Sequence, residues 1–256
     1  MESSILLEKK NNLSLITINR PALKNALNYK SIIELTEAVR SADRLSSTRC
    51  IMLCGSGQEA FSSGADLKEL SEINTLGGRK AFFDSLTVLI STIQECKKPF
   101  IAKVHGFAMA GSMGILAASD IVLASDDAKF SLPEVKVGMI PGIVILALEN
   151  VMSKRMLQYL SFSGESISAQ TAKETGLVSL IFKKNELDKK AHELAESIAC
   201  FSLNALGRTK VMLNRKSRSK HGMLAQRASE MAVYSLSTDC SEGISAFLKK
   251  KRPTWK

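Results

Sequence analysis

The stretch Pro99–Gly114 (PFIAKVHGFAMAGSMG) contains the pattern on which the fold of the whole chain depends. Its first part, Phe100–Val104, is a largely apolar run that predicts a buried strand. The second part, Gly106–Gly114, is dense in small residues, and a short apolar helix is expected to follow it as far as Ala118. A strand, a small-residue turn and a helix in succession are typical of α/β proteins, in which helices pack on parallel sheets.

The alternation of strands and helices continues on both sides of this stretch. Further strands are predicted at Leu13–Asn19, Cys50–Cys54, Ile121–Ala124, Lys129–Ser131 and Leu177–Phe182, and helices at Tyr29–Ala42, Arg79–Cys96, Pro141–Ser161 and Ser168–Thr175, with Asn28 and Ser168 as N-caps. Gly55–Gly64 is predicted as a loop, and Glu186–Lys250 as helical with a break near Gly222. The sequence therefore predicts an α/β core over residues 1–185 and a helical C-terminal region over residues 186–256.

The composition favours a globular protein with a large core. Of the 256 residues 45% are hydrophobic, yet the longest apolar runs, such as Gly142–Leu148, are far shorter than the ~20 residues of a membrane-spanning helix. Met1–Asn12 lacks the apolar core of a secretory signal. We therefore expect no membrane span and a cytoplasmic location, or an organelle matrix if a presequence has been removed.

The cysteines favour a reducing compartment. They are Cys50, Cys54, Cys96, Cys200 and Cys240. An odd number with no second closely spaced pair and no nearby His predicts reduced thiols in the core, and no metal site is expected.

The net charge of +10 suggests a polyanionic partner. The basic clusters are Lys183–Lys190, Arg208–Lys220 and Lys249–Lys256. Because aromatic residues do not interleave with them, stacking on single-stranded nucleic acid gains little support, and no nucleic acid partner is expected. A substrate that carries a nucleotide accounts for the same charge.

Two glycine-bearing motifs suggest sites that their surroundings do not complete. Cys54–Ala60 (CGSGQEA) begins G-x-G after a strand, as in a dinucleotide site, but lacks the third glycine and a following helix. Ala110–Gly114 (AGSMG) is close to the nucleophile elbow of serine hydrolases, with Ser112 as the nucleophile. The triad would need a later His, and His192 and His221 both lie in polar segments expected at the surface.

Two loops can also be considered together. Phe61–Lys68 and His105–Gly114 each enter a short helix through small residues, so that the N–H groups of Ala65 and Gly111 could point to one ligand oxygen. Such a pair forms an oxyanion hole, in which each donor contributes ~3–4 kcal/mol to the transition state. Two tight turns built for packing explain the same residues, and the spacing alone leaves both interpretations open.

Segments along nearly the whole chain resemble one family. They are Ile16–Leu27 (ITINRPALKNAL), Phe61–Leu70 (FSSGADLKEL), Pro99–Gly111 (PFIAKVHGFAMAG), Ser119–Ala124 (SDIVLA), Ala128–Gly142 (AKFSLPEVKVGMIPG), Phe162–Val178 (FSGESISAQTAKETGLV) and Glu242–Lys250 (EGISAFLKK). In this order they resemble the enoyl-CoA hydratase/isomerase (crotonase) superfamily. The resemblance implies a spiral of β-β-α turns, and a helical C-terminal region that builds homotrimers, often paired into hexamers.

The resemblance also implies roles for particular residues. The thioester carbonyl of an acyl-CoA would be held by the N–H groups of Ala65 and Gly111. The residues expected to contact the coenzyme are Ala65, Asp66, Leu67, Lys68, Gly111, Lys24, Phe247 and Lys250. No cofactor is expected beyond the coenzyme A that forms part of the substrate.

The acid–base residues depart from the family pattern. Hydratases of the family use two glutamates, and only the later one is present, as Glu134; position 114 is Gly114. One carboxylate that reaches both C2 and C4 suffices to move a double bond, whereas hydration in the family uses two. The predicted function is therefore isomerisation of 3-enoyl-CoA or hydration of 2-enoyl-CoA with Glu134 alone. A catalytically weakened CoA-thioester binding protein is the alternative, and a Ser112 hydrolase a more remote one.

Other residues near the expected site leave questions open. Asp120, Asp126 and Asp127 are expected to face away from it. Ile143–Leu148 (IVILAL) either lines an acyl pocket or begins a buried helix. If the surroundings of position 114 match the family, Gly114→Glu would raise hydration.

Overall fold

The computed structural model describes residues 3–214 and 221–255. The strands in these ranges are β1 (Ile5–Lys10), β2 (Leu13–Ile18), β3 (Cys50–Gly55), β4 (Ala60–Ser62), β5 (Phe100–Val104), β6 (Phe107–Met109), β7 (Ile121–Ser125), β8 (Lys129–Ser131), β9 (Ser166–Ser168) and β10 (Leu180–Phe182). The α-helices are α1 (Tyr29–Arg44), α2 (Leu67–Glu72), α3 (Leu76–Glu95), α4 (Gly111–Ala118), α5 (Gly142–Leu148), α6 (Lys154–Ser163), α7 (Ala169–Glu174), α8 (Leu187–Ala199), α9 (Leu203–Leu213), α11 (His221–Tyr234) and α12 (Thr238–Leu248). Short 3-10 helices are η1 (Pro21–Leu23) and η2 (Pro133–Val137).

The larger sheet has six strands in the order β1-β2-β3-β5-β7-β10. β1 and β2 are antiparallel, and all other neighbours are parallel. Parallel strands are covered on both faces and are therefore apolar throughout, which explains the continuous apolar run of β3. Ile51 and Leu53 of β3 belong to one core cluster, whereas Cys50 and Met52 belong to another on the opposite face.

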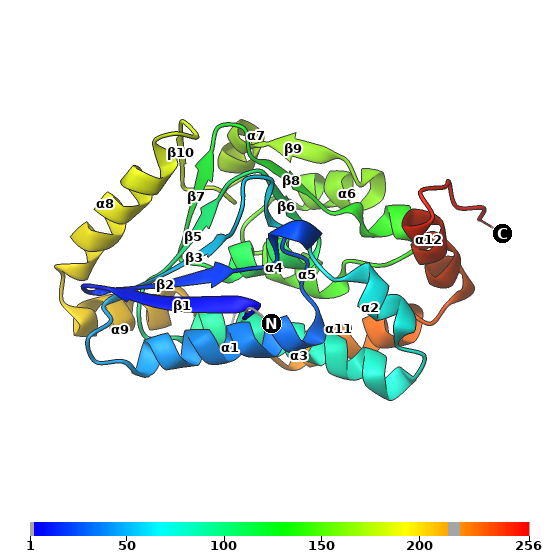
Figure 1. The fold of residues 1–256 in the computed structure, drawn as a ribbon, viewed down its shortest axis with the longest axis horizontal. Coiled ribbons are helices and arrows are strands. Elements are labelled where there is room, and N and C mark those ends of the chain that lie inside the picture. The colour runs from blue at the N-terminus through cyan, green and yellow to red at the C-terminus, as the bar shows by residue number, and fades with distance from the viewer. Residues whose placement is uncertain (1–2, 215–220, 256) are drawn as a thin grey trace.

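Helices cover both faces of the larger sheet. α1 and α3 lie on one side and α8 on the other (Figure 1). α8 presents Leu187, Ala191 and Ala195 to the sheet, because residues four apart share one face of a helix. α11 packs against α3 and α5, so the helical C-terminal residues return to the core.

The smaller sheet has four strands in the order β4-β6-β8-β9, of which β4, β6 and β8 are parallel. Each of these three follows a strand of the larger sheet and is followed in turn by helical structure. The chain thus repeats a β-β-α turn, and the expected α/β spiral is confirmed.

The short strands are where the sequence predictions were wrong. β4 lies inside the segment predicted as a loop, and β1, β6 and β9 were also missed. β4, β6 and β9 have three residues each, too few to show alternation, and β1 (ILLEKK) is apolar only in its first half. α9 ends at Leu213 and Gly222 is the second residue of α11; residues 215–220, next to the break expected near Gly222, lie outside the described residues.

The predicted helix caps and most of the cysteine predictions are confirmed. The side chains of Asn28 and Ser168 accept hydrogen bonds from the N–H groups of Ser31 at 2.9 Å and Thr171 at 3.1 Å. All five cysteines are free thiols, but Cys200 is exposed rather than in the core. Within the described ranges, no helix combines the length and the apolar character needed to cross a membrane.

Candidate active site

Three candidate groups follow the ends of three neighbouring strands. Ala65 comes three residues after β4, Gly111 two residues after β6, and Glu134 three residues after β8. Because these strands are parallel, their carboxyl ends lie at one edge of the smaller sheet, where α/β proteins commonly bind ligands. We call this edge, with Ala65, Gly111 and Glu134, the strand-end site.

The backbone at Ala65 is held by a parallel bridge to Leu27. The N–H of Leu27 donates to the carbonyl of Gly64 at 2.7 Å, and the N–H of Asp66 donates to the carbonyl of Leu27 at 2.9 Å. The N–H of Ala65 lies between these two bonds and donates to no acceptor in the described part of the chain. It is therefore available to a ligand.

The N–H of Gly111 is available for a different reason. Gly111 is the first residue of α4, and the first N–H groups of a helix have no acceptor within it. Ala110 precedes it with φ 51° and ψ −127°, a strained conformation for a residue with a side chain. A Cβ on Gly64 would lie 3.3 Å from the Gly111 nitrogen and 2.7 Å from the Ala110 Cβ, so the two loops are in contact.

Glu134 carries an unpaired carboxyl at the same edge. It is only 6% exposed, and its Oε2 has no hydrogen-bond partner among the described residues. Burial raises the pKa of this carboxyl to about 7, although its own backbone N–H opposes the rise. The N–H of Ala110 donates to the carbonyl of Ser131 at 3.1 Å, which joins the segment of Glu134 to that of Gly111.

The surroundings of Gly114 are apolar. A Cβ at this position would lie 2.9 Å from the Cδ1 of Ile90 and 3.8 Å from the Cγ2 of Val144. Val144 belongs to α5, whose residues Ile143–Leu148 are mostly buried, as one of the two interpretations of this run proposed. A side chain at position 114 would therefore begin against hydrocarbon, at the movable end of Ile90, and this environment gives no support to the gain of hydration expected from Gly114→Glu.

Two residues that the sequence did not single out hold the loop of Ala65. The guanidinium of Arg20 donates to the carboxylate of Asp66 at 3.0 Å and to the carbonyl of Ala26. Asn25 is fully buried with φ 55°, and its amide donates to the carbonyl of Ala60 at 2.8 Å. Asp66 lies 46 residues from Arg20 and Ala60 lies 35 residues from Asn25, so no local pattern could reveal these contacts.

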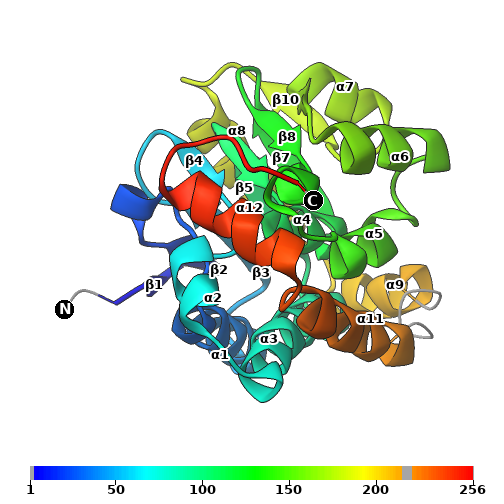
Figure 2. The ribbon, with the colours of Figure 1, turned by 90° about the vertical axis from the view of Figure 1, so that its right-hand side faces the viewer.

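Of the residues expected to contact the coenzyme, some lie on two helices that pack together, and others have side chains that are already engaged. The carboxylate of Asp66 caps α2 and pairs with an arginine, and Leu67 packs on the core, so neither side chain is free. Lys68 is exposed on α2, which packs against α12, the helix of Phe247 (Figure 2). Phe247 is 58% exposed, and Lys250 is exposed with φ 55°.

Lys24 lies beside the loop of Ala65 but points to solvent. Its carbonyl accepts a hydrogen bond from the N–H of Ser63 at 3.0 Å. Its ammonium is 3.2 Å from the carboxylate of Glu59, and both side chains are more than half exposed. Such an exposed pair contributes little to stability, so the ammonium can leave it for another anion.

Helix α12 fixes the helix that carries Glu134. A Cβ on Gly243 of α12 would lie 2.4 Å from the backbone of Val137, and a Cβ on Gly138 would lie 2.5 Å from the carbonyl oxygen of Asp239. η2 and α12 therefore meet backbone to backbone, which only glycine at these two positions permits. The placement of Glu134 depends on this contact.

The competing motifs do not form sites. Ser112 is fully buried, and its hydroxyl contacts the carbonyls of Ser62 at 3.1 Å and Met109 at 2.8 Å. His192 lies on α8 with its Nδ1 at 2.8 Å from the carbonyl of Asp188, and the side chain of His221 lies outside the described residues. β3 leads into β4 and not into a helix, so the dinucleotide interpretation is wrong.

The three aspartates considered as substitutes are engaged elsewhere. Asp120 pairs with the ammonium of Lys210 at 2.6 Å and accepts a hydrogen bond from the N–H of Phe100. Asp126 and Asp127 pair with exposed lysines and precede β8, at the opposite edge of the smaller sheet from Glu134. As expected, they do not face the strand-end site. Within residues 3–214 and 221–255, no three His, Cys, Asp or Glu side chains are grouped so as to hold a metal ion.

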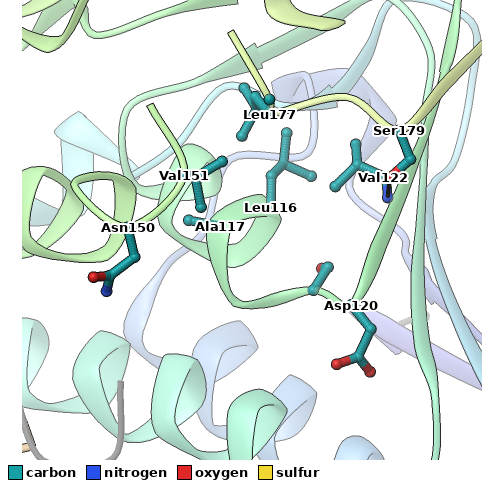
Figure 3. Close-up of a pocket in the computed structure, with 10 residues that line it drawn as sticks. Leu116, Ala117, Asp120, Val122, Asn150, Val151, Leu177 and Ser179 are labelled. Atoms are coloured by element: carbon teal, nitrogen blue, oxygen red, sulfur yellow. Dashed lines mark hydrogen bonds between the residues drawn. The ribbon is translucent and has the colours of Figure 1, made fainter. Parts of the chain in front are cut away.

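A cavity of about 270 Å³ lies at the other end of α4 (Figure 3). Its lining residues are Leu116, Ala117, Ser119, Asp120, Val122, Asn150, Val151, Gly176, Leu177 and Ser179. The lining includes no residue of the strand-end site, and the carboxylate of Asp120 is already paired. This cavity is therefore separate from the candidate chemistry.

The β-β-α spiral and the strand-end site are those of an α/β protein that binds its ligand at the ends of parallel strands. Comparison with known proteins identifies the family. The profile of the family described as "Enoyl-CoA hydratase/isomerase" matches residues 8–256, and the chain belongs to this family. The chain is 32% identical over 253 residues to the short-chain-enoyl-CoA hydratase of Clostridium acetobutylicum, covering 98% of this chain and 96% of that protein. It is 33% identical over 255 residues to the peroxisomal Δ(3,5)-Δ(2,4)-dienoyl-CoA isomerase of Arabidopsis thaliana, covering 93% and 90%.

Solved structures agree with this assignment. An enoyl-CoA hydratase/isomerase from Xanthobacter autotrophicus Py2 superimposes with a TM-score of 0.89 at 27% identity, covering 97% of this chain and 94% of that one. The similar proteins thus include both hydratases and an isomerase.

Proposed function

We propose that the chain isomerises 3-enoyl-CoA thioesters to 2-enoyl-CoA, with Glu134 as the only acid–base group. The N–H groups of Ala65 and Gly111 would hold the thioester oxygen. The exposed Lys24, Lys68, Phe247 and Lys250 would contact the coenzyme. The proposal rests most directly on Glu134, whose buried carboxyl has an unpaired oxygen and a pKa raised to about 7.

Proton transfer by one carboxyl accounts for the whole reaction. The carboxylate of Glu134 takes a proton from C2, and the electron pair moves onto the thioester oxygen while the C3–C4 double bond stays in place. Two N–H donors stabilise this oxyanion more than the starting carbonyl, so they lower the barrier. The same carboxyl then returns the proton to C4, the double bond re-forms between C2 and C3, and the carboxylate is regenerated.

A pKa near 7 suits both halves of this cycle. At neutral pH the carboxyl is ionised in a large fraction of molecules, and it is a much stronger base than an exposed glutamate. Hydration would require a second group to position water, and the place where the family has one holds Gly114 against Ile90 and Val144. The proposal therefore favours isomerisation over hydration.

The test compares two substrates with matched variants. We expect purified protein to convert 3-enoyl-CoA faster than it hydrates 2-enoyl-CoA, and Glu134→Gln to remove the isomerase activity. Glu37→Gln, which changes an exposed carboxylate on α1, is the control and should retain it. Fast hydration that survives Glu134→Gln would refute the mechanism.

A catalytically weakened CoA-thioester binding protein is the second candidate, and Gly114 is the observation that favours it. It predicts tight binding of acyl-CoA without turnover of either substrate. Turnover that disappears in Glu134→Gln would exclude it.

A homotrimer, or a hexamer of two trimers, is the proposed assembly. Its support is the apolar surface of α9 and α11, where Met212 and Leu213 are each 77% exposed and Val233 is 61% exposed. Light scattering on the eluting protein gives the mass directly, and a monomer at micromolar concentration would refute this.

A further inference from the structure

Arg79 is a buried cation whose charge is not balanced within the described part of the chain. Its side chain is 5% exposed, and its Nε donates to the carbonyl of Ile73 at 2.7 Å. Its Nη1 is buried without a hydrogen-bond partner, and no described carboxylate forms a salt bridge with it. An arginine is rarely buried without a partner, so the unpaired face of this guanidinium suggests a missing anion.

Arg79 lies on the face of α3 that leads to the strand-end site. Leu86 and Ile90 follow it by seven and eleven residues, so all three side chains share one stripe of the helix. A Cβ on Gly111 would lie 3.2 Å from the Cδ2 of Leu86, and Ile90 lies next to Gly114. Arg79 is about 10 Å further along the helix axis than Leu86, at the rise of an α-helix.

The other neighbours of Arg79 lie on elements next to the strand-end site. Ile73, which accepts its Nε–H, directly follows α2, the helix that begins just beyond Ala65. Burial lowers the pKa of Arg79, and nearby Cys240 of α12 opposes this. The nitrogen of Cys240 would lie 3.0 Å from a Cβ on Gly138, directly after η2. The guanidinium thus lies between Ile73, which follows α2, and Cys240 of α12, and α12 packs against both α2 and η2, the helix of Glu134.

We propose that Arg79 binds a carboxylate at the far end of the acyl chain, so that the preferred substrates are CoA monothioesters of dicarboxylic acids. This inference rests on the proposed function, because the thioester must lie at Ala65 and Gly111. Leu86 contacts Gly111, and Arg79 lies about 10 Å from Leu86 along α3, on the side away from Ile90. An acyl chain that runs from Gly111 past Leu86 toward the start of α3 would therefore bring its far end to the guanidinium. A planar guanidinium with free N–H groups matches a carboxylate in geometry and charge. The phosphates of the coenzyme are a poorer fit, because they remain near solvent whereas Arg79 is buried.

The test measures binding of saturated thioesters, which cannot be isomerised or hydrated. Calorimetry on the full chain compares adipyl-CoA with hexanoyl-CoA, suberyl-CoA with octanoyl-CoA, and free coenzyme A. We expect at least one diacid thioester to bind about 10- to 100-fold more tightly than its methyl-ended partner, as for a hydrogen bond to a charged group. Arg79→Met should remove this preference while leaving hexanoyl-CoA and free coenzyme A nearly unchanged.

Two further variants control the experiment. Arg79→Lys should retain part of the preference, and Arg40→Met, which removes an exposed arginine of α1, should retain all of it. Equal or weaker binding of both diacid thioesters by the unmodified protein overturns the proposal, whether or not Arg79→Met folds. A loss of affinity for free coenzyme A in Arg79→Met as large as that for the diacid thioesters also overturns it, since Arg79 would then serve the phosphates. Because no turnover is measured, the preference can hold even if the proposed isomerase activity fails.

Discussion

Replacing Glu134 with Gln should remove catalysis and stabilise the fold at alkaline pH. The folded carboxyl has a pKa of about 7 against an ordinary value of 4.5, because burial disfavours its charge. This difference corresponds to about 3 kcal/mol, since each pKa unit is worth about 1.4 kcal/mol. Below about pH 4.5 the group is neutral in both folded and unfolded chains. As the pH rises to about 7 the unfolded chain ionises first, and the folded state loses up to this amount.

Urea denaturation of both proteins at several pH values measures this effect. The free energy of unfolding of Glu134→Gln should nearly equal that of the unmodified protein at pH 4.5 and exceed it by about 1–3 kcal/mol at pH 8, after allowance for burying an amide. The isomerase activity should fall by about 10²–10⁴-fold. In the unmodified protein, kcat/KM should rise with pH and level off above about pH 7, because the base is the carboxylate. A stability difference that does not change with pH, or that favours Glu134 at pH 8, would refute the assigned environment.

Three further substitutions test other parts of the site. Gly114→Glu should destabilise the fold by about 1–3 kcal/mol in denaturant titrations, because the new side chain must displace the end of Ile90 and place a carboxylate among apolar groups, and it should add no hydration of 2-enoyl-CoA; a clear rise in hydration would contradict this. Gly243→Ala should lower both the melting temperature and kcat, because its methyl group overlaps the backbone of Val137 and displaces η2; unchanged kcat would mean that α12 does not position Glu134. Arg20→Met should destabilise the chain by about 3 kcal/mol, as expected for one side of a largely buried ion pair, and should lower kcat/KM; normal kinetics at normal stability would rule out its role in holding the first donor loop.

The sequence predicted the long elements well because their patterns are local. β3 is a continuous apolar run, β5 is interrupted only by Lys103, and α1 has both an apolar stripe and its Asn28 cap. The three-residue strands β4 and β6 have no such pattern, although they place Ala65 and Gly111. The spacing of residues could therefore suggest two N–H donors but could not bring them together. That step needed the resemblance to a family, and then the contact between Gly64 and Gly111.

The rest of the site depends on contacts between distant residues. The sequence showed that a carboxylate is missing at Gly114, but only the structure shows Ile90 in the adjacent space. In the sequence Arg20 only follows a predicted strand, and Arg79 only begins a predicted helix. Arg20 matters because it pairs with the carboxylate of Asp66. Arg79 matters because its buried Nη1 has no partner among the described residues.

The backbone contact between η2 and α12 has a consequence for how the protein is made. Ala65 and Gly111 follow β4 and β6, whose strand partners have all been synthesised once β8 is complete, so this half of the site can form while translation continues. Glu134 follows β8 by only three residues, but Gly243, against which its helix rests, is synthesised more than one hundred residues later. Under the proposed function, a nascent chain therefore acquires the two donors that hold a thioester before it acquires a fixed acid–base group.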